Sequence, residues 1–322
     1  MIQASRAPRL RLDAPTWRDR AARHARRIDA LTAGHRQRRA RGLAHPVEDF
    51  LFTYYPFTVA SLRRWHPGPA VVLLDAAGDE RAGWPFYRAT DEGLELDQAA
   101  YLRARADEAR RVRELLSHTA VRPMQLGCFG LHEWAMVYRL DAAERRHPRW
   151  PLRLGAAGTD AVVESHALRC THVDAYRFFT PAARPRNALT PNRERQVEVE
   201  QPGCLHATMD LYKWAMRLTP AVPSELVADC FGLALALRVL DMRASPYDLS
   251  GLGYQPIAVE TTEGKAEYVA AQRRYAAVGQ DLRARLVAVC DALLAEAPVF
   301  AAPEVSANPV GEPESGLRLP PP

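Results

Sequence analysis

Apolar residues return every three to four positions along most of this 322-residue chain, which is the spacing of helices that bury one face. One segment differs, because residues 70–90 (AVVLLDAAGDERAGWPFYRAT) combine an apolar run, a Gly–Asp turn and an aromatic run, a pattern typical of a β-hairpin. We therefore expect a mainly α fold, a compact multi-helix domain with a small β-hairpin or short strands. The helices predicted by this periodicity cover residues 15–43, 58–65, 95–119, 128–140, 205–218, 224–242 and 261–296.

Capping residues mark where several of these helices begin. Thr16, Ser224 and Thr262 precede or open apolar-periodic segments, and hydroxyl side chains at such positions accept hydrogen bonds from the first-turn amides. The pattern is ambiguous over residues 161–178, which are compatible with short strands or with a helix.

Composition separates a folded middle from two different ends. A hydrophobic content of 48% is sufficient for a buried core, and we expect a single mainly helical domain over residues 15–297. Residues 1–14 precede the first predicted helix and are expected to be flexible. Residues 298–322 hold seven prolines among small and acidic residues, so a disordered tail is expected there.

Charge is distributed unevenly along the chain. Residues 1–43 contain 12 Arg and 3 Asp, a net charge of +9, whereas the whole chain has a net charge of +5, which leaves −4 for the remainder. An Arg-rich helix over residues 15–43 is a candidate contact for the phosphates of DNA. The alternative is a solvated helix in which Arg merely replaces Lys.

Hydropathy and cysteine usage indicate the compartment. The chain has no run of 18 apolar residues and no apolar segment of signal-peptide type at its start, so we expect no membrane span and a cytoplasmic location. Five cysteines are widely spaced and form no Cys-x-x-Cys pair. This usage is typical of reduced thiols and argues against a disulfide framework or a zinc ribbon.

Several histidines stand beside carboxylates in otherwise apolar sequence. Imidazole and carboxylate groups are the ligands of Fe, Mn and Zn sites, and they also supply a general base with the group that orients it. The chain has no His-Glu-x-x-His motif, so no pairing is specific by itself. The pairings are His45 with Glu48 and Asp49, His132 with Glu133, Glu164 with His166, His172 with Asp174, and His206 with Asp210.

Two of these pairings are the stronger candidates for a site. On a helix over residues 205–218, His206 and Asp210 are one turn apart and share a face. On a strand, His172 and Asp174 would share a face as well, and a carboxylate buried among the neighbouring aromatic residues would need a partner. The structural alternative is that each pair closes a hydrogen bond in the core.

Aromatic residues near these groups could form a binding pocket. We select Tyr54, Tyr55, Trp134 and Tyr176 as pocket candidates, because an extruded nucleobase stacks on aromatic rings with about 1–3 kcal/mol per contact. The alternative is that these rings belong to an ordinary helical core.

Several long stretches of the sequence resemble one known group of proteins. These stretches are HPVEDFLFTYYPF, LRRWHPG, GCFGLHEWAMVYR, THVDAYRFFTPAARP, EQPGCLHATMDLYKWA and LDMRASPYDLSGLGYQPI. They resemble actinobacterial proteins commonly labelled 3-methyladenine DNA glycosylase, and the resemblance covers nearly all of residues 15–297. It implies removal of an alkylated purine from DNA by cleavage of its N-glycosidic bond, with no cofactor.

Three hypotheses about function follow. In a glycosylase, Asp174 or Asp210 would stabilise the sugar and orient water, with His206 as a possible base. In a metal-dependent enzyme acting on a small molecule, His132, His172, His206 and Glu133 would bind Fe, Mn or Zn. In a non-enzymatic helical binding protein, the polar pairs would be structural. The residues favour the first two equally, and the resemblance favours the glycosylase.

Overall fold

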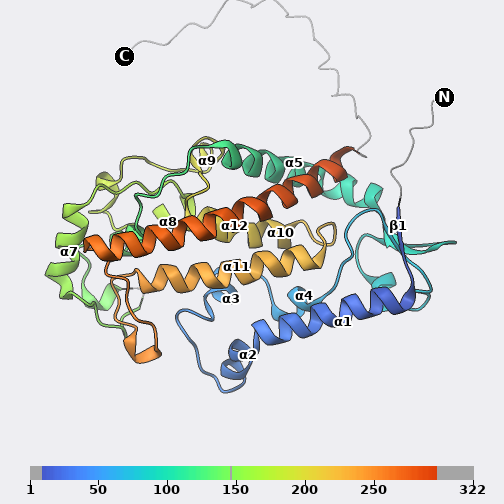
Figure 1. Ribbon diagram of the computed structural model, residues 1–322, viewed down its shortest axis with the longest axis horizontal. Helices are drawn as coiled ribbons and strands as arrows, with labels where there is room; N and C mark the ends of the chain where they lie inside the picture. The colour runs from blue at the N-terminus through green and yellow to red at the C-terminus, as the bar shows by residue number, and fades with distance from the viewer. Residues whose placement is uncertain (1–8, 146, 296–322) are drawn as a thin grey trace, which may run out of the picture.

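Helices dominate the computed structural model, which describes residues 9–145 and 147–295 (Figure 1). Twelve helices and a small four-stranded sheet are present in this part of the chain, and 57% of the residues are helical. The predicted mainly α fold with short strands is therefore confirmed. The predicted tail over residues 298–322 lies outside the described residues.

Long helices packed side by side form the body of the molecule (Figure 1). Helix α12 (Thr262–Ala295) contacts α5 (Gln98–Val121) along one side and α11 (Ser224–Arg243) along the other. Helix α10 (Leu205–Arg217) packs against both α11 and α12, and α1 (Ala14–Leu31) packs against α11. All five were predicted from their apolar periodicity.

Short helices and turns connect this framework. The helices are α2 (Ala33–Ala40), α3 (Phe50–Tyr54), α4 (Val59–Arg63), α6 (Leu131–Ala135), α7 (Gly155–Ser165), α8 (Val173–Tyr176) and α9 (Gln196–Val199). Turns of 3₁₀ type cover Glu80–Gly83, Ala142–Glu144, Arg184–Arg186 and Ser250–Leu252.

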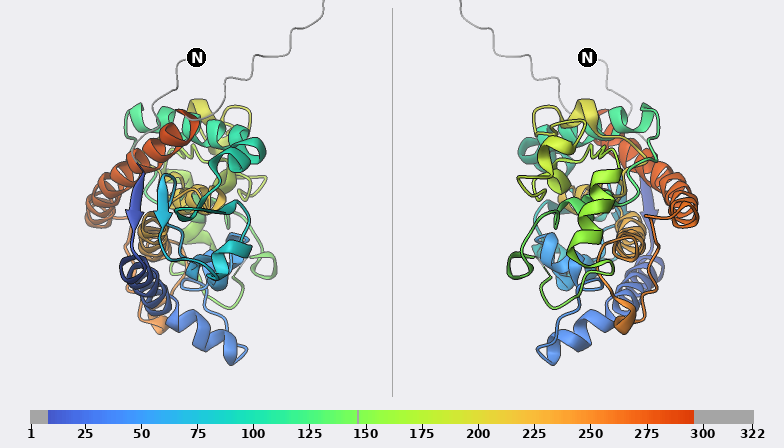
Figure 2. Two further views of the ribbon diagram at one scale, coloured as in Figure 1. Left: turned by 90° about the vertical axis from the view of Figure 1, so that its right-hand side faces the viewer. Right: turned by 90° about the vertical axis from the view of Figure 1, so that its left-hand side faces the viewer.

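A four-stranded sheet of order β1-β2-β4-β3 lies at one end of the molecule, toward the viewer in the left panel of Figure 2. Strand β1 (Leu10–Leu12) is parallel to β2 (Val71–Leu73). Strand β4 (Gly93–Leu96) is antiparallel to both β2 and β3 (Tyr87–Thr90). The predicted flexible segment 1–14 thus differs from the structure at β1, while residues 1–8 lie outside the described part.

The predicted hairpin over residues 70–90 is wrong in its pairing. Strands β2 and β3 lie on opposite sides of β4, and the actual hairpin is β3–β4. Gly93 allows this arrangement, because its φ is +146° and a Cβ there would lie 2.2 Å from the carbonyl oxygen of Leu73. The glycine was outside the segment that carried the hairpin pattern.

The predicted helix over residues 15–43 is divided in two. Thr32 separates α1 from α2, and its hydroxyl donates a hydrogen bond to the carbonyl oxygen of Ile28 at 2.7 Å. Asp13 caps the first helix by accepting a hydrogen bond from the amide of Thr16 at 2.9 Å. Thr16 is therefore a first-turn residue and not the predicted cap.

Two further predicted caps are also shifted. Ser224 already belongs to α11, and its hydroxyl donates to the carbonyl oxygen of Arg64 while it accepts from the amide of His66. Thr261 rather than Thr262 caps α12, because its hydroxyl accepts from the amide of Gly264 at 3.0 Å.

The middle of the chain is less helical than predicted. Within residues 128–140 only the five-residue segment α6 is helical. Phe129 and Gly130, with φ of 46° and 70°, prevent an earlier start, and turns follow the helix up to Arg139, whose φ is 51°. The ambiguous residues 161–178 contain the end of α7 and the short helix α8, with extended chain between them that pairs at Leu168 with Asn187.

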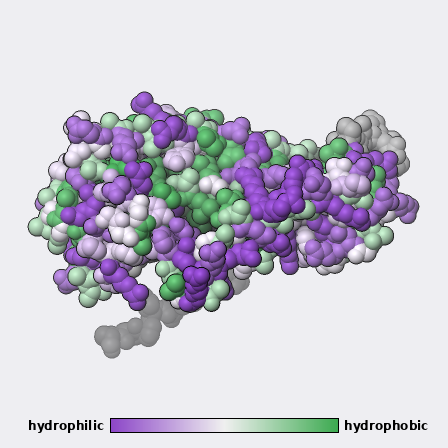
Figure 3. Space-filling view, turned by 60° about the horizontal axis from the view of Figure 1, so that its bottom comes forward, coloured by the Kyte–Doolittle hydropathy of each residue, from purple (hydrophilic) through white to green (hydrophobic). Residues whose placement is uncertain are grey.

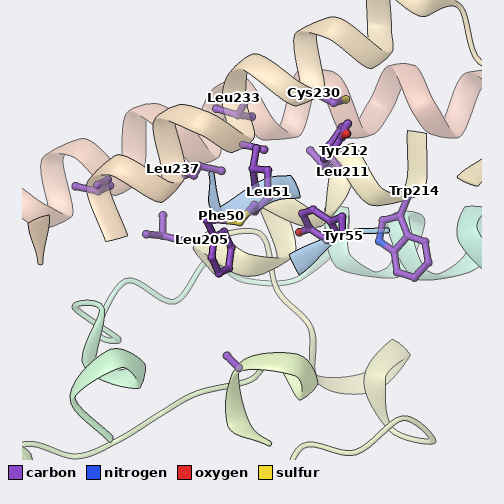
Figure 4. Packing of buried hydrophobic residues seen from close by; sticks show 14 of the residues in the cluster. Phe50, Leu51, Tyr55, Leu205, Leu211, Tyr212, Trp214, Cys230, Leu233 and Leu237 are labelled. Carbon is purple, nitrogen blue, oxygen red and sulfur yellow. The ribbon is translucent and has the colours of Figure 1, made fainter. Parts of the chain in front are cut away.

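The principal core lies between the helices. Figure 4 shows Leu51 and Tyr55, at and just after α3, pointing toward Leu211 and Tyr212 of α10. Tyr55 and Tyr212 meet edge to face, with ring centroids 5.6 Å apart. On the face shown in Figure 3, hydrophobic residues gather near the middle and polar residues surround them. Among the helices of the described ranges, none combines the length and the hydropathy that a membrane span requires.

Candidate functional site

An open pocket of about 480 Å³ lies where α3, α5, α8 and α10 approach one another. Its lining combines aromatic rings with a strongly cationic rim. The aromatic residues are Tyr54, Tyr55 and Phe57, and the cations are Arg105, Arg177, Arg193, Lys213 and Arg217. Among the described lining residues one is acidic, Asp174. Such a lining suits a flat ligand that carries phosphate.

Asp174 lies in this pocket between three cations. Its Oδ1 is 2.5 Å from Arg193 Nη2 and 3.5 Å from Arg177 Nη1, and its Oδ2 is 3.4 Å from Lys213 Nζ. Burial alone would raise the pKa of this carboxyl, but the charge of Lys213 and the neighbouring cations lower it further than burial raises it. Asp174 is therefore an anion at neutral pH.

Asp210 lies beneath Asp174 and is fully buried. Its Oδ1 accepts a hydrogen bond from the Tyr55 hydroxyl at 2.6 Å, and its Oδ2 lies 2.6 Å from Lys213 Nζ and 3.3 Å from His172 Nε2. Burial opposes its ionisation, but Lys213 and His172 together hold the pKa of Asp210 well below its usual range. Lys213 consequently joins the two carboxylates that the sequence identified as candidates.

His206 and Asp210 both belong to α10, as predicted, but their side chains belong to two different clusters of polar residues. Asp210 is bonded to His172, whose ring stacks on that of His206 with centroids 5.3 Å apart. On its other side His206 meets His132 edge to face at 4.5 Å. Burial and the charge of His132 lower the pKa of His206 well below its usual range, so its imidazole is neutral.

A second group is formed by His132, His206 and Asp241. All three are buried, and their ligand atoms lie within 4.8 Å of one another. Burial disfavours a charge on His132, yet Asp241 Oδ1 at 2.7 Å from its Nε2 raises the pKa of His132 well above its ordinary value. Glu133 is turned away from this group and accepts a hydrogen bond from Arg238 Nη1 at 2.8 Å.

A narrow cavity borders the second group. His132, His206, Cys128, Cys204 and Gln272 are among its lining residues, and it has room for about one water-sized particle. The predicted metal ligands are thus divided: His132 and His206 border this cavity, whereas His172 and Glu133 have other partners.

The predicted aromatic pocket residues are also divided. Tyr54 and Tyr55 line the open pocket. Trp134 is fully buried, and its indole N–H donates to the carbonyl oxygen of Ala244 at 2.8 Å, so it belongs to the core. Tyr176 packs against the core beside Phe179.

The remaining His–acid pairings have local roles. His45 accepts hydrogen bonds from the amides of Val47 and Glu48 through Nδ1. Glu164 accepts hydrogen bonds from the Tyr138 hydroxyl and from Arg139, away from both groups described above.

Many arginines of the Arg-rich segment 15–43 are engaged by carboxylates. The ion pairs are Arg20 with Glu225, Arg23 with Asp19, Arg27 with Asp229, Arg36 with Asp29, and Arg38 with Glu48 and Asp49. These contacts reduce the positive field that the segment presents to a polyanion.

Sequence reasoning missed Asp241 and the pocket arginines. Asp241 lies in the strongly apolar α11 three residues after Arg238, and a carboxylate in such a context signals a buried partner. Arg177 and Arg193 lie in segments without helical periodicity, so the pattern gave no reason to bring them together.

Comparison with protein-family models, curated proteins and solved structures finds no match for this chain.

Proposed function

We propose that this protein is a DNA N-glycosylase that removes alkylated purines, with the open pocket as its active site. The observation that carries the proposal is the position of Asp174, an ionised carboxylate inside a pocket with aromatic walls and a cationic rim. The resemblance of the sequence stretches to proteins labelled 3-methyladenine DNA glycosylase points to the same chemistry.

The pocket suits a base that has been turned out of the duplex. Tyr54 and Phe57 offer ring faces for stacking, and a volume of about 480 Å³ is in the range that accommodates small ligands. An alkylated purine carries positive charge, and in this proposal Asp174 pairs with that charge while the cations of the rim pair with DNA phosphates.

Hydrolysis of the glycosidic bond then requires little proton transfer to the leaving group. The bond between C1′ and the base nitrogen breaks, and its electron pair neutralises the positive charge of the alkylated base. The sugar becomes an oxocarbenium-like cation, which the Asp174 carboxylate stabilises. Water adds its oxygen to C1′ and loses a proton to Asp174 or to solvent.

Lys213 and Asp210 act on the reaction through Asp174. Asp210 fixes the ammonium group of Lys213, which in turn lies 3.4 Å from Asp174 Oδ2. Tyr55 and His172 fix Asp210. In this proposal Asp174 is the catalytic residue and Asp210 is a positioning residue.

The DNA backbone would contact the rim of the pocket. Arg177 and Arg193 line it with more than half of each side chain exposed, and guanidinium groups bind phosphate through paired N–H donors. Arg39 and Arg41 of the Arg-rich segment are exposed as well, so this segment supplies further contacts in the proposal.

The test is release of methylated base from alkylated duplex DNA by purified variants. We expect Asp174→Asn to lower the single-turnover rate by about 10²–10⁴-fold, while Asp107→Asn, a fully exposed carboxylate on α5, is unchanged. Because the cations hold Asp174 ionised, the wild-type rate should stay constant from about pH 8 to about pH 5. Equal rates for Asp174→Asn and the wild type would refute the assignment.

A metal-dependent enzyme is the second candidate. The specific observation in its favour is the buried group of His132, His206 and Asp241.

A further inference from the structure

The His132–His206–Asp241 group lies outside the proposed glycosidic site and has chemistry of its own. We propose that it binds one divalent first-row transition-metal ion through His132 Nε2, one ring nitrogen of His206 and Asp241 Oδ1. Two imidazoles and one carboxylate are a ligand set that proteins use for Fe²⁺ and Zn²⁺, with further positions left for water or substrate.

The distances suit a shared ion. Ligand atoms about 2.1 Å from one metal are at most about 4.2 Å apart, and the three donors here lie within 4.8 Å of one another, so a small inward shift brings all three within reach of one ion. They come from three separate helices, α6, α10 and α11, which are fixed by the core. A small side-chain adjustment would therefore complete the site without rearrangement of the backbone.

The surroundings of His132 and Asp241 are also compatible with a bound ion. His132 Nε2 and Asp241 Oδ1 are both buried and lie 2.7 Å apart, and within the described ranges neither has another hydrogen-bond partner. Buried polar atoms are nearly always paired, and these two can pair with each other or with one shared ion. An ion between them and His206 would satisfy both.

Neighbouring residues hold the carboxylate in the required orientation. Arg238 Nη1 donates to Asp241 Oδ2 at 3.0 Å and to Glu133 Oε1 at 2.8 Å. This contact occupies one oxygen of Asp241 and leaves Oδ1 directed toward the histidines. Outer hydrogen bonds of this kind orient the ligands of metal sites.

The adjoining cavity gives the ion room for an additional ligand. It borders His132 and His206 and has space for about one water-sized particle. The polar groups of Gln272 and Tyr268 are also on its wall. A water molecule could accordingly complete the coordination of the metal.

The test measures metal directly, on the untagged full-length protein. We would determine the metal content by mass spectrometry as purified, and again after chelation and dialysis against Zn²⁺ or Co²⁺. We expect about one equivalent in the wild type, and affinity at least about tenfold weaker in His206→Ala and Asp241→Asn. His66→Gln is the matched control, a buried histidine that contacts Tyr87 and should keep full metal binding.

Thermal unfolding separates loss of metal from loss of fold. Added Zn²⁺ should raise the Tm of the wild type and of His66→Gln, but not that of Asp241→Asn, whose side chain keeps its shape. Less than about 0.1 equivalent in the wild type after reconstitution would overturn the proposal, leaving an ion pair between protonated His132 and Asp241. Binding that survives both ligand substitutions would overturn it too. Neither result bears on base release, so the glycosylase proposal is tested independently.

Discussion

Asp210 is buried as an anion because three different side chains converge on it. A carboxylate removed from water is unfavourable unless its oxygens are paired, and the Tyr55 hydroxyl, His172 and Lys213 supply those partners. The sequence paired Asp210 with His206, one turn away on the same helix. Lys213 is also on α10, three residues after Asp210, but Tyr55 follows α3 and His172 precedes α8, and no local pattern connects these two segments to α10.

The contribution of the Tyr55 hydroxyl to stability can be measured with Tyr212 as a control. Tyr55→Phe removes the hydrogen bond to Asp210 and should lower the free energy of unfolding by about 1.5–3 kcal/mol, the range for bonds to charged groups. Tyr212→Phe removes a buried hydroxyl that has no hydrogen-bond partner in the described ranges, so it should change stability by less than about 0.5 kcal/mol.

Urea unfolding of both variants at neutral pH provides the comparison. Similar losses for Tyr55→Phe and Tyr212→Phe would show that the hydrogen bond to Asp210 contributes nothing specific.

Among the secondary-structure elements, hydrophobic periodicity correctly predicted the long helices. It gave wrong bounds or pairings where a residue with an unusual backbone conformation determines where an element begins or how it packs. Helices α5, α10, α11 and α12 follow their apolar patterns closely. The residues around α6 read as one longer helix, but the left-handed conformation of Gly130 prevents an earlier start, and turns rather than helix connect its end to Arg139. Likewise, Gly93 allows β4 to pass close to Leu73, which an alternation pattern cannot reveal.

Two helical glycines make a matched test of helix packing. A Cβ at Gly279 of α12 would lie 2.5 Å from Thr208 Cγ2 of α10, whereas a Cβ at Gly232 of α11 meets nothing within 4 Å. Gly279→Ala should therefore destabilise the protein by about 1–3 kcal/mol through overpacking. Gly232→Ala should stabilise it by about 0.5–1 kcal/mol, the gain in helix propensity.

Thermal unfolding of the two variants checks this directly. A stabilising Gly279→Ala would mean that α10 and α12 are not in close contact at this position.

At the scale of the whole molecule, polar residues connect the two candidate sites. His206 of the buried group stacks on His172, which contacts Asp210. Lys213 contacts both Asp210 and Asp174, and Asp174 lies in the open pocket. The sequence identified His132, His172, His206, Asp210 and Asp174 as candidates, because several histidines stand beside acids, but it did not identify Lys213 or Asp241. It could not assign them to two groups, because that division depends on how α6, α8, α10 and α11 meet.

The charge distribution of the whole molecule predicts where DNA is bound. DNA binding by such a protein weakens with salt, with a slope of the logarithm of the association constant against the logarithm of the salt concentration. We expect the double variant Arg177→Gln and Arg193→Gln to make this slope shallower by about 2, because each lost phosphate contact removes close to one released counterion. The pair Arg39→Gln with Arg41→Gln, in the Arg-rich segment, should reduce the slope less, because neither residue lines the open pocket.

Binding of a short duplex at several salt concentrations distinguishes the two surfaces. A larger effect of the second pair would place the principal DNA contact on residues 15–43.

The most direct test of the central claim is to identify the product. Purified wild-type protein is incubated with methylated duplex DNA, and the free base and the abasic sites are quantified by mass spectrometry. The claim that the Asp174 pocket cleaves N-glycosidic bonds predicts methylated purine and abasic sites in equal amounts, and far less of both products from Asp174→Asn in the same time. No base released by the wild type, or equal release by Asp174→Asn, would contradict it.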